Sequence, residues 1–422
     1  MAAKKLRLLA WCDSPGSDMN GAVRDTTTGF GQVSKWILGA LEATGKYDIT
    51  ILGINHFQPS TTWKGHQIIP AKWLGHERDV YGYGVFQQLI TEQHWDLVFV
   101  INDLFVVEEV WEGLASIKNR PKIIYYFPVD CTVQSNRSHF LEVADFPVAY
   151  TKWAKDEAVK VYPHLKDIPY IYHGVDTRVY RFLSKETIKK VKTEVFGEKP
   201  PFIITTVNRN NVRKNLTQLI WNFAQFKKIY KNSVLNLHTA KRDHGINLDL
   251  CCQAAGLDLD KDIHFPSNYN TVNGYPAEAM NSLWNMSDMC VTTNRGEGYG
   301  LMAIESLAAG CPLIVPDHTI HKELWQGKAW LYPAKEHVYV EDSGHRLQGR
   351  DEDITKLMLR VASKIKKNDP EVEMKRQLGR QFAEENDWRI IGQKWVKLFS
   401  AVEQTPLEKL RVQKEISTGE EV

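Results

Sequence analysis

The sequence predicts an α/β protein made of two domains, each built on a parallel sheet. Short apolar segments alternate with amphipathic segments along most of the chain, a pattern typical of parallel strands covered by helices. The length of 422 residues suits two domains of about 100–200 residues each. The alternation restarts after Pro200-Pro201, so we place the domain boundary within residues 172–200.

Each half supplies its own set of expected elements. In the first half the apolar run 96–101 is nearly continuous, as in a strand covered on both faces. The strands expected there are 6–11, 48–53, 96–101, 122–127 and 146–150, and the helices are 31–43, 83–93, 105–116 and 153–161. In the second half the expected strands are 202–207, 233–238, 262–265, 288–293 and 312–315, and the helices are 214–229, 247–256, 275–285 and 300–309.

The composition excludes several classes of protein. Hydrophobic residues make up 43% and charged residues 25%, which is ordinary for a globular protein. A net charge of +2 gives no strong field toward nucleic acid or membranes. No apolar run approaches the roughly 18 residues of a membrane span. Six cysteines without CxxC or zinc spacing indicate buried, reduced thiols and a cytoplasmic protein.

The first turn of the chain is rich in glycine. Gly29, Phe30 and Gly31 stand between the first expected strand and the first expected helix, where glycines let the backbone approach a ligand and a helix N-terminus favours an anion. The turn lacks the third glycine of a dinucleotide fingerprint and is not a P-loop. A donor-binding loop and an ordinary tight turn both fit these residues.

A pair of cations opens the second half. Arg209 and Lys214 stand five residues apart in the loop after the strand 202–207. A guanidinium fork and an ammonium point charge at such a turn suit a diphosphate. A solvated basic loop is the alternative interpretation.

The segment 294–312 carries the strongest pattern. Gly296, Gly298 and Gly300 form a loop before a helix that stops at Gly310. Glu297 lies at the helix entrance, where it can accept hydrogen bonds from hydroxyl groups or cap the helix. Glu305 lies inside the apolar helix, where a carboxylate is costly unless it has a partner in the protein or a ligand.

The spacing Glu297-x7-Glu305 resembles the signature of the retaining GT-B glycosyltransferases of family 4, the glycosyl transferases group 1. The resemblance extends over nearly the whole chain, through the residues of the glycine turn, the linker-like segment 171–176, the cations Arg209 and Lys214, and the segment 385–388. Two positions depart from the family pattern. Asn208 stands where glycine is usual, and Asp130 stands near the place of a histidine that many relatives carry.

The resemblance implies two Rossmann-like domains that face each other across a cleft, with a C-terminal helix crossing back to the first domain. The implied division is 1–180 for the acceptor domain, 181–385 for the nucleotide-sugar domain, 386–405 for the returning helix and 406–422 for a flexible tail.

The implied reaction moves a hexose or similar sugar from a UDP- or GDP-linked donor to a hydroxyl acceptor with retention. Arg209 and Lys214 would stabilise the leaving diphosphate, Glu305 would bind the ribose and Glu297 the sugar hydroxyls. The catalytic candidates are Glu297, Arg209, Lys214 and Asp130. The donor-binding candidates are Gly29, Phe30, Gly31, Arg209, Lys214, Glu297, Gly298, Tyr299, Gly300, Leu301 and Glu305.

No cofactor or metal is expected in this scheme, and the Asp258-Leu259-Asp260 spacing is interpreted as a turn. The acceptor is not identified by the sequence. An aromatic and basic stretch and one further histidine are candidates to contact it, with ordinary packing as the alternative. These residues are Trp63, Lys64, His66, Trp73, His76, Arg78, Tyr81, Tyr83 and His139.

Two other functions remain open at this point, and a third lacks its required motif. A same-fold enzyme that glycosylates hydroxymethylated DNA bases is possible but not favoured, because the net charge gives no basic footprint. A non-catalytic GT-B scaffold would bind nucleotide without turnover. A nicotinamide oxidoreductase would need the missing dinucleotide fingerprint.

Overall fold

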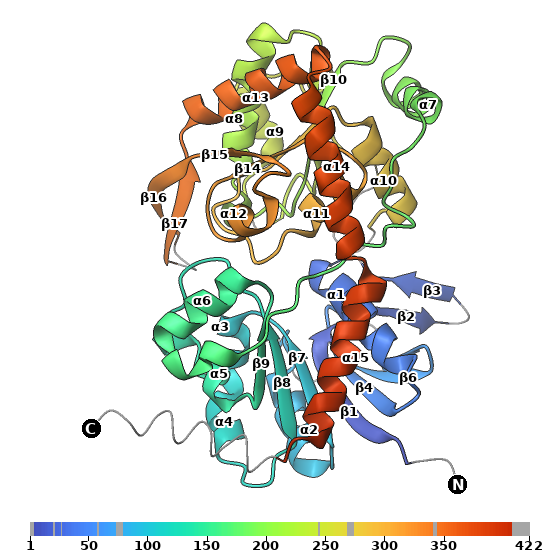
Figure 1. Cartoon of the computed structure of the whole chain (residues 1–422), viewed down its shortest axis with the longest axis vertical. Coiled ribbons are helices and arrows are strands. Elements are labelled where there is room, and N and C mark those ends of the chain that lie inside the picture. Colours follow the sequence, from blue (N-terminus) through green and yellow to red (C-terminus); the bar gives the residue numbers. More distant parts are fainter. Residues whose placement is uncertain are drawn as a thin grey trace. The chain divides into compact units, whose positions relative to one another are not determined.

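The computed structural model describes residues 4–19, 22–26, 28–56, 59–72, 79–243, 245–267, 274–340 and 344–406. It divides the chain into two compact units, Met1–His173 with Trp388–Val422 and Gly174–Asp387 (Figure 1). The candidate residues Trp73, His76 and Arg78 and nearly all of the expected tail, residues 407–422, lie outside the described residues.

The first unit contains a nine-stranded sheet of order β3-β2-β5-β6-β4-β1-β7-β8-β9. The strands from β6 to β9 in this order are parallel, whereas β5, β2 and β3 pair antiparallel. The five strands expected from the sequence are β1 (Leu6–Asp13), β4 (Tyr47–Ile54), β7 (Leu97–Ile101), β8 (Lys122–Phe127) and β9 (Phe146–Ala149). The strands that the sequence analysis missed are β2 (Gly16–Met19), β3 (Ala22–Asp25), β5 (Thr61–Trp63) and β6 (His66–Pro70).

Helices cover this sheet on both faces. They are α1 (Gly29–Glu42), α2 (Tyr83–Glu92), α3 (Leu104–Val107), α4 (Trp111–Ala115), α5 (Phe140–Val143), α6 (Lys152–Val161) and α15 (Trp388–Gln404), with short 3-10 turns η1 (Glu108–Val110), η2 (Ser135–Arg137) and η3 (Pro163–Asp167). The prediction of one helix over 105–116 was wrong. The 3-10 turn η1 interrupts it, and because side chains at i and i+3 eclipse in such a turn, Val107 and Val110 are both buried.

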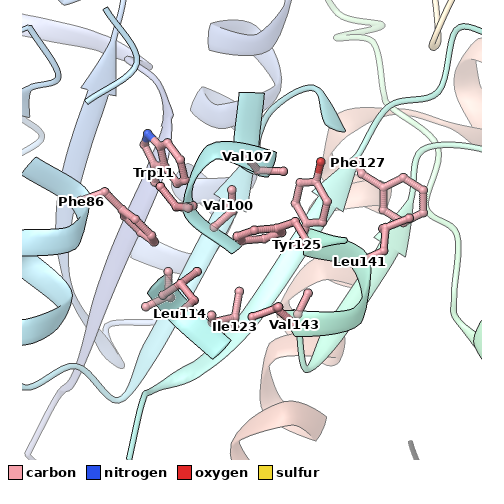
Figure 2. Packing of buried hydrophobic residues seen from close by; sticks show 14 of the residues in the cluster. Trp11, Phe86, Val100, Val107, Leu114, Ile123, Tyr125, Phe127, Leu141 and Val143 are labelled. Atoms are coloured by element: carbon pink, nitrogen blue, oxygen red, sulfur yellow. The ribbon is translucent and has the colours of Figure 1, made fainter. Parts of the chain in front are cut away.

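Buried side chains fix the short helices to the sheet. Val107 of α3, Leu114 of α4 and Leu141 of α5 pack over the strand residues Ile123 and Tyr125 (Figure 2). The segments that leave the carboxyl ends of β7 and β8 therefore have defined positions, although each helix is only four or five residues long.

The second unit is built on a six-stranded parallel sheet of order β12-β11-β10-β13-β14-β15. Its strands are β10 (Phe202–Val207), β11 (Ser233–His238), β12 (Ile263–His264), β13 (Met289–Val291), β14 (Leu313–Pro316) and β15 (Trp330–Tyr332). The helical elements are α7 (Lys185–Phe196), η4 (Val212–Lys214), α8 (Leu216–Ile229), α9 (Leu248–Ala254), α10 (Ala277–Met286), α11 (Leu301–Ala308), α12 (Ile320–Trp325), α13 (Asp351–Lys366) and α14 (Pro370–Glu385). An antiparallel ribbon of β16 (Ala334–Val340) and β17 (Gly344–Gly349), which the sequence analysis also missed, completes the unit.

The chain passes between the units twice, and the two passages are hydrogen bonded where they enter the second unit. The amide of Val175 donates to the carbonyl of Asn386 at 3.1 Å, and the carboxylate of Asp387 accepts from the amide and hydroxyl of Thr177 at 3.1 and 2.5 Å. The first and last residues of the second unit are therefore hydrogen bonded to each other.

The close packing of α14 on α11 depends on a glycine. A Cβ added at Gly379 would lie 2.9 Å from Cδ2 and 3.1 Å from Cβ of the buried Leu307. We expect Gly379→Ala to lower the free energy of unfolding by about 1–3 kcal/mol through overpacking, measured by chemical denaturation. Gly84→Ala in α2 is the matched control, since its nearest neighbour would be 3.7 Å away, and helix propensity there predicts a gain of about 0.5–1 kcal/mol. Equal or higher stability of Gly379→Ala would contradict this packing.

Candidate active site

The candidate site begins with two neighbouring strands of the second unit. β10 and β13 pair in parallel through Ile204 with Met289 and Thr205 with Cys290. Their carboxyl ends therefore lie at the same edge of the sheet, where ligands bind in folds of this kind. The segment after β10 carries the two expected cations, and the segment after β13 carries Glu297.

Several hydrogen bonds join these two segments. The Thr293 hydroxyl donates to the carbonyl of Asn215 at 2.9 Å, and the amide of Arg295 donates to the carbonyl of Arg213 at 2.8 Å. The guanidinium of Arg213 donates to the carbonyl of Gly296 at 2.7 Å. The two loops thus behave as one structural element.

Glu297 is the centre of a buried charge cluster and is 7% exposed. Its carboxylate contacts the Lys214 ammonium, lies 3.4 Å from the Arg213 guanidinium and accepts from the side-chain amide of Asn294 at 3.2 Å. Burial alone raises the pKa of this carboxyl, but the charges of Lys214 and Arg213 outweigh burial and hold the pKa at about 2. Glu297 is therefore ionised, and two cations surround it.

Two buried histidines orient Asn294. Its amide nitrogen is used by Glu297, so its side-chain oxygen accepts from Nε2 of His321 at 3.0 Å, and its carbonyl accepts from Nε2 of His318 at 3.1 Å. Burial lowers the pKa of His318 to about 4 and that of His321 to about 3, so both rings are neutral and add no further charge to the cluster.

Sequence reasoning missed Arg213, Asn294, His318 and His321 as members of this cluster. Arg213 directly precedes Lys214, so the basic loop itself was a signal for it. Asn294 begins the glycine-rich segment. The two histidines lie on the far side of β14 in the sequence and carried no local signal.

The glycines and Tyr299 of the segment 296–301 shape the loop around Glu297. Gly300 has a φ of 82° and a Cβ there would lie 3.2 Å from Cγ of Glu297, so a side chain would press on the carboxylate. Gly298 is buried, Tyr299 packs edge-on against Trp325, and Leu301 begins α11.

Arg209 has a different partner from the other cations. Its side chain is 57% exposed, and its Nε lies 2.7 Å from the carboxylate of Asp243. The structure therefore places Arg209 on Asp243 and Lys214 on Glu297, so each expected cation holds a carboxylate of the chain itself.

Glu305 lies one turn into α11, in a more apolar environment. Burial raises the pKa of its carboxyl to about 7, and polar interactions with Tyr180 and Trp284 oppose this rise. The structure brings no cation to Glu305 in its described contacts, in contrast to Glu297.

The remaining candidates belong to the first unit. Gly29, Phe30 and Gly31 form the first turn of α1 rather than a separate loop, because Thr28 caps the helix and accepts from the amide of Gly31 at 2.9 Å. The Thr28 hydroxyl in turn donates to Asp13 at 2.5 Å. Asp130 is partly exposed and follows β8.

Other expectations from the sequence have clear outcomes. The interpretation of Asp258 as part of a turn is confirmed, since its carboxylate accepts from the amides of Asp260 and Lys261 at 3.0 and 3.2 Å. Tyr83 packs edge-on against Trp11 in the core, and Tyr81 accepts the Trp11 indole N–H through its carbonyl at 2.8 Å, which favours ordinary packing for both. All six cysteines are free, and four of them are buried: Cys12, Cys252, Cys290 and Cys311.

None of the helices within the described ranges is long and apolar enough to cross a membrane. Over the same ranges, no group of three or more His, Cys, Asp or Glu side chains is arranged to hold a metal ion.

The buried pair of Lys214 and Glu297 can be tested by a double-mutant cycle. Lys214→Met leaves an ionised carboxylate without its closest partner, and we expect a loss of about 3–5 kcal/mol in the free energy of unfolding. Adding Glu297→Gln removes that charge, so the double variant should lose less than Lys214→Met alone. Lys190→Met in α7, where the side chain is 77% exposed, should change stability by less than about 0.5 kcal/mol. Additive losses would show that the two side chains do not interact.

The raised pKa of Glu305 predicts a pH dependence of stability. Between its ordinary value of 4.5 and about 7, the folded protein keeps a proton that the unfolded chain releases. The free energy of unfolding therefore falls as the pH rises through this interval, by about 3 kcal/mol at most. Glu305→Gln has no such proton, so its stability relative to the parent should increase from pH 4.5 to pH 8. A difference between Glu305→Gln and the parent that does not change with pH would refute the raised pKa of Glu305.

Comparisons with known proteins relate part of the chain to a family and the whole of it to a fold. Residues 187–337 match the family model "Glycosyl transferases group 1". Sucrose-phosphate synthase from Thermosynechococcus elongatus has a similar structure, with 15% identity, a TM-score of 0.68 and coverage of 94% of this chain and 99% of that one. HepE from Anabaena, solved in complex with UDP and glucose, gives 14% identity, a TM-score of 0.67 and coverage of 94% and 100%.

A third similar structure is α,α-trehalose 6-phosphate synthase from Burkholderia multivorans, with 11% identity, a TM-score of 0.63 and coverage of 94% and 99%. No curated protein matches the chain by sequence. At these identities the structural likeness establishes the fold, which is GT-B. The chain therefore has the GT-B fold, and its residues 187–337 are similar to the glycosyl transferases group 1.

Proposed function

We propose that this chain is a retaining glycosyltransferase of family 4 that transfers a hexose or similar sugar from a UDP- or GDP-linked donor to a hydroxyl acceptor. The observation that carries the proposal is the buried cluster of Lys214, Arg213 and Glu297 where two neighbouring strands end. HepE, which shares the fold, has been solved with UDP and glucose, so UDP-linked donors are the first to test.

The cluster has the charge that a sugar diphosphate needs. Lys214 and Arg213 together exceed the single charge of Glu297, and Arg209 stands on the same connection after β10. When the bond from the sugar to the diphosphate breaks, negative charge grows on the leaving phosphate, and cations already fixed in place stabilise it without reorganisation. Lys214 and Arg209 would exchange their internal carboxylates for phosphate oxygens.

The two glutamates suit the uncharged parts of the donor. An ionised carboxylate only accepts hydrogen bonds and has two oxygens, so Glu297 would bind hydroxyls of the transferred sugar. Glu305, with a pKa of about 7, would bind the ribose diol, because two hydroxyl donors favour its ionised form.

Retention follows in this proposal from attack on the same face of the anomeric carbon. The bond from that carbon to the phosphate oxygen breaks, the bond to the acceptor oxygen forms, and the acceptor proton moves to the departing phosphate. Arg and Lys supply the positive charge, so the proposal includes no metal or cofactor. Asp130 is proposed as the first-unit residue that contacts the donor sugar, and Glu297 and Asp130 are the candidates for a nucleophile if the enzyme uses double displacement. We place the reaction in the cytoplasm, where free thiols stay reduced.

A donor screen by thermal shift tests the proposal. Binding raises stability by RT ln(1 + [L]/Kd), so UDP-glucose, UDP-galactose, GDP-mannose and GDP-glucose can be ranked directly by the shift in Tm. We expect one nucleotide class to stand out and Glu305→Ala to abolish its shift. Lys214→Met should lower kcat of the matching reaction by about 10²–10³, the loss expected for one stabilising donor.

Two exposed variants serve as controls for this screen. Lys190→Met and Glu352→Ala remove the same charges far from the cluster in sequence, and both should keep the full shift in Tm. Absence of a shift with every donor would contradict the proposal. If a donor binds but its sugar is transferred neither to water nor to any hydroxyl acceptor, the chain is instead a nucleotide-binding scaffold.

A further inference from the structure

A second group of chemically active side chains lies in the first unit, apart from the residues proposed to bind the donor. Glu108 opens η1 after β7 and α3, and His139 precedes α5 after β8. β7 and β8 are paired parallel neighbours, so both residues belong to connections that leave the same carboxyl edge of the sheet. This is the edge where an α/β sheet binds its ligands.

The imidazole of His139 is held on two sides. Its Nδ1 is hydrogen bonded to Oε1 of Glu108, and its ring stacks on Trp111 with centroids 4.7 Å apart and an interplanar angle of 24°. An ionised carboxylate can only accept, so Nδ1 carries the proton in this bond. In the neutral imidazole Nε2 then keeps a lone pair. Nε2 has no hydrogen-bond partner in the described ranges, and the side chain is 36% exposed.

The elements that carry this pair are anchored in the core. Val107 directly precedes Glu108 and is fully buried, as are Phe140 and Leu141 directly after His139. Figure 2 shows Val107 and Leu141 packed over the sheet. The amide of Leu141 also donates to the carbonyl of Ser138 at 3.0 Å. The imidazole is thus presented in a fixed orientation, which reduces the entropy cost of binding a ligand.

Two further observations distinguish the pair from a structural salt bridge. The second carboxylate oxygen of Glu108 is buried and has no hydrogen-bond partner among the described residues, whereas buried polar atoms that only hold a fold are normally paired. Phe105 stands three residues before Glu108, a spacing that shares one face of a helical turn, and its ring is 53% exposed. The connection that carries Glu108 therefore also carries an exposed aromatic residue.

We propose that His139, positioned by Glu108, and Phe105 bind the acceptor and that the acceptor is an uncharged sugar. The lone pair of Nε2 accepts a hydrogen bond from a sugar hydroxyl, and the apolar face of a sugar ring packs on the exposed phenyl ring. The charged partner of the imidazole is a carboxylate, which repels a phosphorylated acceptor. That the bound sugar is the acceptor rests on the proposed transferase function, whereas the existence of a sugar site does not.

Saturation-transfer NMR on the full chain tests the sugar site without any turnover. The probes are methyl α-glucoside, methyl α-galactoside, methyl α-mannoside and maltose. At least one should bind the parent, and His139→Ala and Phe105→Ala should each weaken its binding about tenfold, the value of one hydrogen bond or one packing contact. His94→Ala removes a 77% exposed imidazole just before β7, at the opposite edge of the sheet, and should leave binding unchanged.

Glu108 is a positioning residue in this proposal, and its test uses the imidazole itself. The ¹⁵N shifts of His139 should report a proton on Nδ1 in the parent and a mixture of tautomers in Glu108→Gln, whose amide no longer enforces one tautomer. Glu112→Gln, an exposed change one helical turn away, should leave the shifts unchanged. A purely structural Glu108 would leave the tautomer of His139 unaffected in a folded variant.

Kinetics then separate this inference from the proposed function. With the donor found by thermal shift, His139→Ala should raise KM for the sugar acceptor about tenfold, while hydrolysis of the donor by water and the donor-induced shift in Tm stay at the parent values. If the enzyme turns over donor and His139→Ala and Phe105→Ala bind the sugar as the parent does, the inference is wrong and the proposed function stands. The same holds if the parent turns over donor but binds none of the probes. If the parent turns over no donor but binds a sugar, and the two variants lose that binding, the transferase proposal is wrong and the sugar site stands.

Discussion

The ion pair of Lys214 and Glu297 is the interaction on which the second unit's site depends. A carboxylate that is only 7% exposed stays ionised because two cations lie against it. This condition fixes the loops after β10 and β13 relative to each other, since a shift of either loop leaves a buried charge uncompensated. Asn294, which is held by its two histidines, donates a hydrogen bond to the Glu297 carboxylate. The left-handed backbone at Gly300 keeps the loop around that carboxylate tight.

Such a pair adds little to the free energy of folding, but it fixes the positions of its two side chains. Desolvation offsets most of the attraction in a buried ion pair, so the gain lies in the fixed position of the ammonium group. Arg209 follows the same principle at the surface, where Asp243 holds it. In the proposed reaction a diphosphate competes with carboxylates that already orient the cations, and the cations need no reorganisation when charge develops.

Features with a repeating local signal could be predicted from the sequence, and features made by long-range contacts could not. The strands β7, β8 and β10 are apolar runs buried on both faces. Arg209, Lys214 and Glu297 lie in recognisable turns, and Glu305 lies in the helix that follows one of them. The strands β2, β3, β5, β16 and β17 are short or polar, and their sequences show no regular pattern of apolar residues. His321 meets Asn294, and Tyr180 meets Glu305, only because the order of strands and helices brings them together.

The two units use the same edge of their sheets with opposite electrostatics. In the second unit two cations surround one carboxylate, which favours an anion. In the first unit a carboxylate fixes an imidazole and leaves one nitrogen as an acceptor, which favours an uncharged hydroxyl. A second cation-rich site would compete for the nucleotide and lower the concentration of productively bound donor. The proposed division of charge therefore gives each substrate one site that the other substrate disfavours, and it does so with residues that follow neighbouring parallel strands in both units.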